Sequence, residues 1–119
     1  MVRFHTDLDV WNKARQLALE VYRTTKGFPR EELYGMTSQL RRAAIAVVAN
    51  IAEGSARRGR REFLQFCYVA RGSSTEVETL LIIAKDLGWL SVHDYEELGT
   101  GYKGVSQMLT SLTRSLSNQ

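Results

Sequence analysis

The sequence has 119 residues, of which 44% are apolar and 24% charged, and its formal net charge is +3. This length fits one folded domain and leaves no room for a second core with a linker. The composition is that of an ordinary globular chain, which excludes a disordered tail, a fibre and a disulfide-rich scaffold. We therefore expect a single domain over residues 1–119.

Several absences in the sequence favour the cytoplasm. Cys67 is the only cysteine, so no intramolecular disulfide can form and a reducing compartment is the simplest expectation. The first residues, MVRFHTDLDVW, are charged and lack the apolar stretch of a secretory signal. The longest apolar run, residues 43–49, is far shorter than the roughly 20 residues that a membrane span needs. We predict a cytoplasmic protein that does not enter a membrane.

Apolar residues recur at alternating intervals of four and three positions, which is typical of one stripe along a helix. The pattern predicts four helices over residues 6–26, 37–53, 60–87 and 91–116. The stripes are, in chain order, Trp11, Ala14, Ala18 and Val21; Leu40, Ala44, Val47 and Ile51; Phe63, Cys67, Ala70, Ser74, Val77, Leu81 and Ala84; and Tyr95, Leu98, Tyr102, Val105, Leu109, Leu112 and Leu116. Short connections make successive helices antiparallel. The fold class is therefore all-α, an up-down-up-down antiparallel four-helix bundle.

Residues typical of helix ends punctuate these stripes. Thr6 and Ser91 are each followed three residues later by an aspartate, a pattern that resembles a capping box. Gly27, Gly54 and Gly88 each follow a stripe, at positions where a left-handed residue commonly closes a helix.

The second and third predicted helices carry more apolar residues than one bundle can bury. Nine of the ten residues 43–52 are apolar, and residues 80–84 repeat the excess, whereas a bundle helix needs about three apolar positions in seven. Surface alanines are tolerable because alanine is a good helix former, but Ile45, Val48, Ile82 and Ile83 are not explained in this way. We expect a homo-oligomer that covers these second faces.

Arginines concentrate where the second predicted helix turns into the third. The window 41–61 contains Arg41, Arg42, Arg57, Arg58, Arg60 and Arg61 against Glu53 as its one acid. A helix C-terminus favours cations, but Arg60 and Arg61 begin a helix, where the dipole opposes them. Arginine binds phosphate through two parallel hydrogen bonds. We predict that Arg57, Arg58, Arg60 and Arg61, with Arg41 and Arg42 contributing, contact RNA or DNA with weak sequence selectivity and strong salt dependence. A solvated loop without a partner is the alternative.

No set of residues converges in the pattern of an enzyme site. His5 and His93 begin different helices, Cys67 lies on a core stripe, and no phosphate-binding loop or Cys/His cluster is present. We predict no catalytic residue, metal or cofactor. The polar residues inside the apolar helices instead suggest a structural network, in which Arg42 lies near Glu76 and Glu53 near Arg61 across the second and third helices.

A family resemblance rests on several blocks of sequence in a fixed order. These are Tyr34-Gly35-Met36-Thr37-Ser38-Gln39-Leu40-Arg41-Arg42-Ala43-Ala44; Asn50-Ile51-Ala52-Glu53-Gly54; Glu62-Phe63 with Phe66; Ala70-Arg71-Gly72-Ser73 with Glu76 and Glu78; and Leu87-Gly88-Trp89-Leu90. Together they resemble the four-helix bundle family first recognised in intervening sequences of large-subunit ribosomal RNA genes. The chain is similar also to the accessory variability protein of diversity-generating retroelements. It departs from the family pattern at Ala56, where a second glycine is common.

The resemblance implies an up-down bundle that assembles into a cyclic homopentamer, and it implies no catalytic residue. The retroelement likeness implies nucleic acid and a reverse transcriptase as partners. Combined with the arginine pattern, it favours a non-enzymatic oligomeric protein that binds RNA or DNA. The alternative is a protein-protein interaction adaptor that uses apolar and acidic surfaces, including Glu96 and Glu97, with no direct nucleic-acid role.

Overall fold

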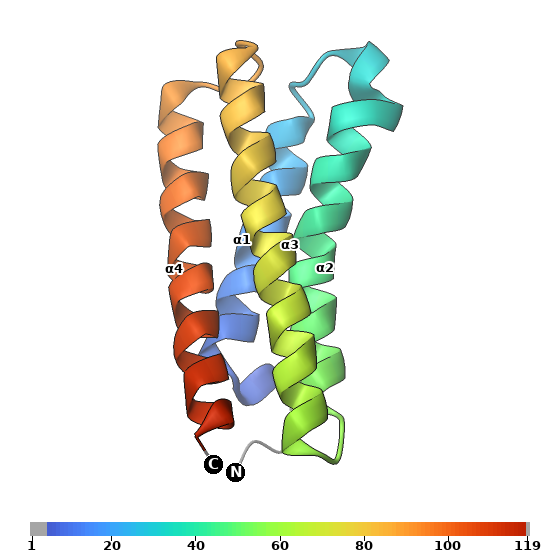
Figure 1. Cartoon of the computed structure of the whole chain (residues 1–119). Helices are drawn as coiled ribbons and strands as arrows, with labels where there is room; N and C mark the ends of the chain where they lie inside the picture. The colour runs from blue at the N-terminus through green and yellow to red at the C-terminus, as the bar shows by residue number, and fades with distance from the viewer. Residues whose placement is uncertain (1–4, 119) are drawn as a thin grey trace.

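The computed structural model describes residues 5–118, and within that range all regular structure is helical. Four long helices form the bundle: α1 (Asp9–Thr25), α2 (Ser38–Ser55), α3 (Arg60–Asp86) and α4 (Val92–Ser117). Successive helices run in opposite directions (Figure 1). The all-α class and the four helices are therefore as predicted. The largest difference in bounds is at α1, which begins at Asp9 rather than at residue 6.

The helix ends confirm one predicted cap and correct others. The Ser91 hydroxyl accepts a hydrogen bond from the Asp94 N–H at 3.0 Å. The predicted cap at Thr6 is wrong, because a short 3₁₀ helix, η1 (His5–Asp7), occupies that position and Leu8 precedes α1 without a side-chain cap. Among the described residues only Gly88 has a positive φ, of 80°, so a left-handed closing residue is correct there and wrong at the other two predicted glycines.

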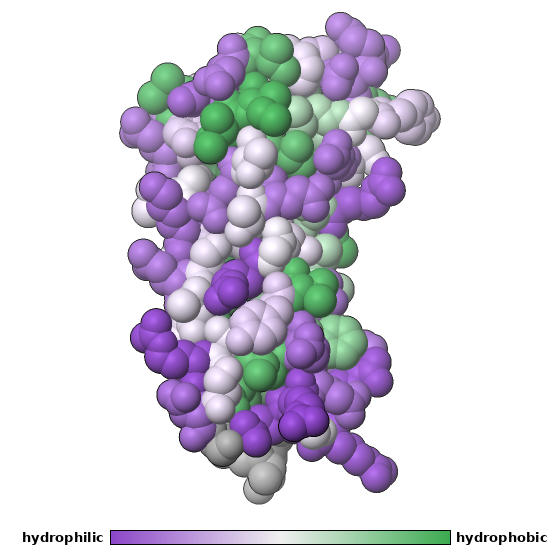
Figure 2. All heavy atoms as spheres, in the orientation of Figure 1, coloured by the Kyte–Doolittle hydropathy of each residue, from purple (hydrophilic) through white to green (hydrophobic). Residues whose placement is uncertain are grey.

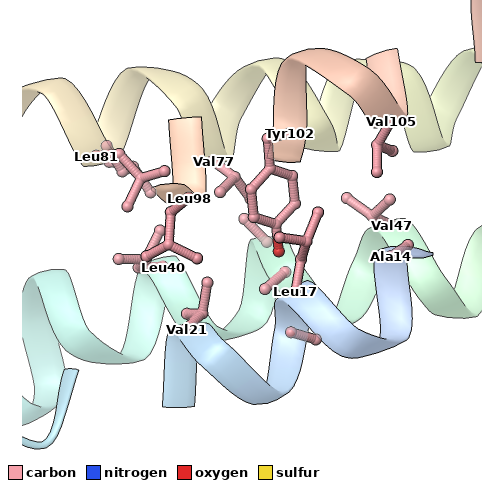
Figure 3. Close-up of a cluster of buried hydrophobic side chains, with 14 of the residues drawn as sticks. Ala14, Leu17, Val21, Leu40, Val47, Val77, Leu81, Leu98, Tyr102 and Val105 are labelled. Carbon is pink, nitrogen blue, oxygen red and sulfur yellow. The ribbon is translucent and has the colours of Figure 1, made fainter. Parts of the chain in front are cut away.

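The predicted stripes meet in one core. The largest fully buried side chains include Tyr102, Leu40, Ile51, Leu81 and Leu109, which come from α2, α3 and α4. Figure 3 shows the ring of Tyr102 projecting from α4 into the middle of the core, with its oxygen towards α1 and α2. That hydroxyl is buried and has no hydrogen-bond partner among the described residues.

A polar set, of which Ser74 is fully buried, joins α3 to α4. The hydroxyl oxygens of Ser74 and Ser106 lie 2.8 Å apart, and Ser106 donates to Glu78 at 3.1 Å. Satisfied hydrogen bonds of this kind offset the cost of burying the serines and fix the register of the two helices.

The segment before α2, for which the sequence predicts no regular structure, forms two short turns. It consists of η2 (Arg30–Glu32), a 3₁₀ turn, and η3 (Leu33–Thr37), a wide turn with a kink at Gly35, whose φ of −113° and ψ of −111° are not helical. The Glu32 carboxylate accepts from the Met36 N–H at 3.1 Å, which holds the two turns together. Leu33 and Tyr34, the first residues of η3, are exposed to solvent.

The surplus apolar residues lie outside the core. Ile45, Ile82 and Ile83 are 46%, 43% and 41% exposed, and Val48 is half-buried. Figure 2 shows apolar side chains gathered on the upper part of the visible face, over the region where α3 ends and α4 begins. The apolar residues predicted to exceed what the core can bury are therefore exposed on the surface of the single chain.

Candidate nucleic-acid interface

The turn between α2 and α3 is held by close packing of the two helices. Gly54 lies one residue before the end of α2 and faces α3, and a Cβ atom at this position would lie 2.6 Å from Cβ of Phe66 and 3.0 Å from Cδ1 of Phe63. Ala56 follows α2, and Gly59, in extended conformation, precedes α3. The absence of a side chain at Gly54 thus lets the helices converge and sets the position of the arginine-rich turn.

Arg57 is anchored to the surface of this hairpin. Its guanidinium donates to Glu53 at 2.7 Å and lies 3.7 Å from Glu62. It also lies 5.1 Å from the centre of the Phe66 ring. Because these partners are exposed, they add little stability, but they orient the guanidinium along the hairpin.

Arg60 has a structural partner on another helix. One of its terminal nitrogens donates to the backbone carbonyl of Leu116 at 2.6 Å, near the end of α4. The last carbonyls of a helix lack partners within the helix and favour a cation. Arg60 therefore caps α4, a role that no sequence pattern indicates because the two residues are far apart in the chain.

Arg58 and Arg61 are the two arginines of the turn that project freely. Both are exposed, and neither forms an ion pair or side-chain hydrogen bond with any residue in the range 5–118. Arg114, in the last turn of α4, is exposed at the same end of the bundle (Figure 1). A basic residue in the last turn of the fourth predicted helix was the available signal for it.

Acidic residues reduce the charge of this end. Glu53 and Glu62 pair with Arg57, and the exposed Asp7 and Asp9 lie where the chain enters α1, at the same end (Figure 1). Within the described residues, the unpaired positive charge of this end is thus carried by Arg58, Arg60, Arg61 and Arg114, because the bond of Arg60 to a neutral carbonyl leaves its charge in place, whereas Arg57 is paired.

Arg41 and Arg42 are not part of the same patch. They lie near the start of α2, and fifteen residues of mostly helical chain place Arg42 about 22 Å from Arg57. Arg41 donates to Thr25 Oγ1 at 2.8 Å and lies over the Tyr22 ring at 4.7 Å. Arg42 is exposed and donates to Ser38 at 3.2 Å.

The predicted ionic network across α2 and α3 is wrong in its partners. Glu76 accepts from Gln39 at 3.4 Å, whereas Arg42 turns to Ser38, although Arg42 and Glu76 line the same surface hollow. Glu53 pairs with Arg57 on its own helix instead of with Arg61. The predicted register is nearly correct, but Gln39 takes the place of Arg42 beside Glu76, and Arg42 and Glu53 form contacts along their own helix.

The other reactive side chains are placed in separate environments. Cys67 is fully buried, and burial raises the pKa of its thiol to about 11. His5 packs edge-on against Trp11, whereas His93 lies 3.6 Å from Glu97 at the other end of the molecule. Over residues 5–118 there is no group of three or more potential metal ligands. None of the helices described is long and apolar enough to cross a bilayer.

The fold matches a solved structure. A crystal structure from Bacteroides thetaiotaomicron, of a protein with unknown function from the S23 ribosomal protein family, superposes with a TM-score of 0.82. It is 21% identical, and the match covers 88% of this chain and 95% of that one. No curated protein matches the sequence.

Family membership rests on the sequence. The model of the 23S rRNA-intervening sequence protein family matches residues 6–111. This range contains all four helices except the last turns of α4, and it includes every block on which the resemblance was based. The bundle with its arginine-bearing α2–α3 turn therefore belongs to the 23S rRNA-intervening sequence protein family.

Proposed function

We propose that this chain is a non-enzymatic, oligomeric nucleic-acid-binding protein that contacts phosphates through the α2–α3 turn. The observation that carries the proposal is the pair Arg58 and Arg61, which are exposed at the α2–α3 turn and have no partner among the described residues. Arg61 also lies in the first turn of α3, where the helix dipole opposes a cation. The fold does not require a charge there, whereas a phosphate ligand would.

Arg57 and Arg60 have supporting parts in this proposal. Each keeps unused guanidinium donors while one side is held by Glu53 or by the Leu116 carbonyl. They would therefore orient the turn and add weaker contacts. The run 57–61 itself contains no aromatic residue for base stacking, so the expected binding is weakly selective and strongly dependent on salt.

The proposal includes assembly into a cyclic homo-oligomer, which the family resemblance gives as a pentamer. The exposed Ile45, Ile82 and Ile83 support it, because such surface is costly to leave in water. In a ring the turns of all copies recur around one rim. A reverse transcriptase remains a predicted partner, on the retroelement likeness alone.

The test is a salt titration of binding to a single-stranded RNA and to a DNA duplex. Replacing Arg58 and Arg61 by alanine should flatten the slope of log affinity against log salt by about 0.7 to 0.9 for each phosphate that the turn no longer neutralises. The matched control replaces Arg30 and Lys103, two exposed cations outside the turn, by alanine. This control changes the net charge equally and should leave the slope near the wild-type value.

Three outcomes would reject the proposal: an unchanged slope after removal of the Arg58 and Arg61 side chains, an equal change in the control, and no binding by the wild type at low salt. Each would favour the adaptor alternative, in which Glu96, Glu97 and the apolar surface engage another polypeptide.

A further inference from the structure

The outer face of α3 carries an exposed tyrosine two turns beyond the arginine-rich turn. Tyr68 lies seven residues after Arg61, so the helix places both residues on the same side, with their Cα atoms about 10 Å apart. Tyr68 is 40% exposed. An aromatic ring outside the run 57–61 therefore continues the surface that Arg58 and Arg61 begin.

Arg71 lies against this ring. Its guanidinium carbon is 5.1 Å from the centre of the Tyr68 ring, and Arg71 forms no ion pair with any residue in the range 5–118. An uncharged partner therefore positions the guanidinium and leaves its charge unpaired. Unstacked nucleic-acid bases stack on tyrosine rings and on guanidinium planes, and a guanidinium also donates to phosphate. The pair Tyr68 and Arg71 offers both kinds of contact side by side.

No acidic residue interrupts this face of α3 between Arg61 and Thr79. The helical period places on it Arg61, Leu64, Gln65, Tyr68, Arg71, Gly72, Thr75 and Thr79. Glu76 and Glu78 lie on its flanks, and their carboxylates accept hydrogen bonds from the neighbouring helices α2 and α4. Figure 2 shows strongly hydrophilic side chains over the lower end of α3, beside the α2–α3 turn. The charge of this face therefore suits a polyanion that extends from the turn along the helix.

Gly72 keeps the tyrosine ring uncovered. A helical side chain covers the surface over the turn before it, so a side chain at position 72 would lie over Tyr68. A Cβ atom at Gly72 would meet nothing within 4 Å, which shows that close packing in the chain does not require this glycine. Glycine also weakens the interior of a helix. An open ring that a ligand can reach gives this position a use that folding alone does not.

We infer that a single-stranded nucleic acid bound at the α2–α3 turn continues along this face of α3 and stacks a base on Tyr68 and the Arg71 guanidinium. A duplex cannot bind in this way, because its bases are stacked on one another and paired. The inference rests on the proposed function and names the form of nucleic acid that the same site binds.

RNA and DNA single strands share the chemistry that this face recognises, which is an unpaired base beside a phosphate. The hydroxyls of Thr75 and Thr79 donate to backbone carbonyls of α3, so neither is free to donate to a ribose hydroxyl. The test therefore uses single strands of both kinds, with the same base sequence, and a duplex of the same length.

Tyr68→Ala is the first variant. Loss of one stacked base should weaken binding of the single strand on the order of tenfold and leave the affinity for the duplex unchanged. Because stacking neutralises no phosphate, the plot of log affinity against log salt should shift without a change of slope. Tyr68→Phe keeps the ring and should bind as the wild type does. Alanine is a good helix former, and helical circular dichroism would verify that the variant folds.

Gly72→Leu tests the same surface without removing the ring. Leucine is a better helix former than glycine, and its side chain is long enough to lie over Tyr68, so the variant should fold at least as well and bind the single strand more weakly. Gly72→Ala adds only a methyl group and should bind as the wild type does.

Arg71→Gln removes one charge and should lower the salt slope for the single strand by about 0.7. Val69→Ala is the matched control for the changes on α3, because Val69 is 53% exposed but lies on another side of the helix. This control should change neither the affinity nor the slope.

A tenfold loss with both kinds of single strand supports the inference, and a loss with RNA alone or DNA alone supports it and identifies the sugar. The inference is overturned if Tyr68→Ala binds the single strands as tightly as the wild type, or if its affinity for the duplex falls equally. In both cases the proposed function stands as long as removal of the Arg58 and Arg61 side chains flattens the salt slope. If the wild type binds none of these nucleic acids, both fail.

Discussion

Replacing Gly54 by alanine should destabilise the protein, although alanine is the better helix former. The new Cβ would lie 2.6 Å from Cβ of Phe66 and 3.4 Å from the backbone carbonyl of Phe63. These atoms cannot swing aside like the end of a flexible side chain, so α2 and α3 must separate by about 1 Å to restore ordinary contact. Overpacking of this kind costs typically about 1–3 kcal/mol, occasionally more, and helix propensity returns at most about 1 kcal/mol. We expect the free energy of unfolding to fall by about 2 kcal/mol, a value within this overpacking range.

The matched control is Gly72→Ala on the same hairpin. Gly72 lies in the middle of α3, and a Cβ atom there would meet nothing within 4 Å. Propensity then acts alone and should stabilise the protein by up to about 1 kcal/mol. Urea unfolding at one fixed protein concentration compares the two variants. A Gly54→Ala protein as stable as the wild type would show that the helices are further apart at this point, and that the turn is not set by close packing.

Three further changes test the interior and the turn. Tyr102→Phe removes a buried hydroxyl that has no partner among the described residues and should raise the free energy of unfolding by about 1 kcal/mol; a decrease in the urea midpoint would show that the hydroxyl is hydrogen-bonded after all. Arg60→Ala removes the bond to the Leu116 carbonyl and should lower the thermal midpoint, whereas Arg58→Ala should not. Burial raises the pKa of the Cys67 thiol to about 11, so the folded protein keeps this proton at a pH where the unfolded chain loses it. The free energy of unfolding should therefore fall as the pH rises from about 9 towards 11. Cys67→Ala should remove that part of the pH dependence, measured by urea unfolding at each pH.

The long helices could be predicted because each has an apolar residue at every turn that must be buried. At α3, the spacing from Cys67 through Ala70, Ser74 and Val77 repeats the same burial requirement at every turn, and the buried residues of the structure follow it. The segment before α2 has no such repetition. Its two short turns depend on single contacts, such as that of Glu32 with the Met36 N–H, which composition does not reveal.

The sequence predicted where the arginine-rich turn lies but not which partner each arginine has. Four arginines within five residues marked the α2–α3 turn. The division between Arg58 and Arg61, which have no partner in the described part of the chain, and Arg60, which caps α4, depends on where a distant helix ends. The Arg42–Glu76 pairing failed for a related reason. Gln39 lies directly across from Glu76, and Arg42 is one helical turn further along α2, so a register correct to within a few residues still selects the wrong partner.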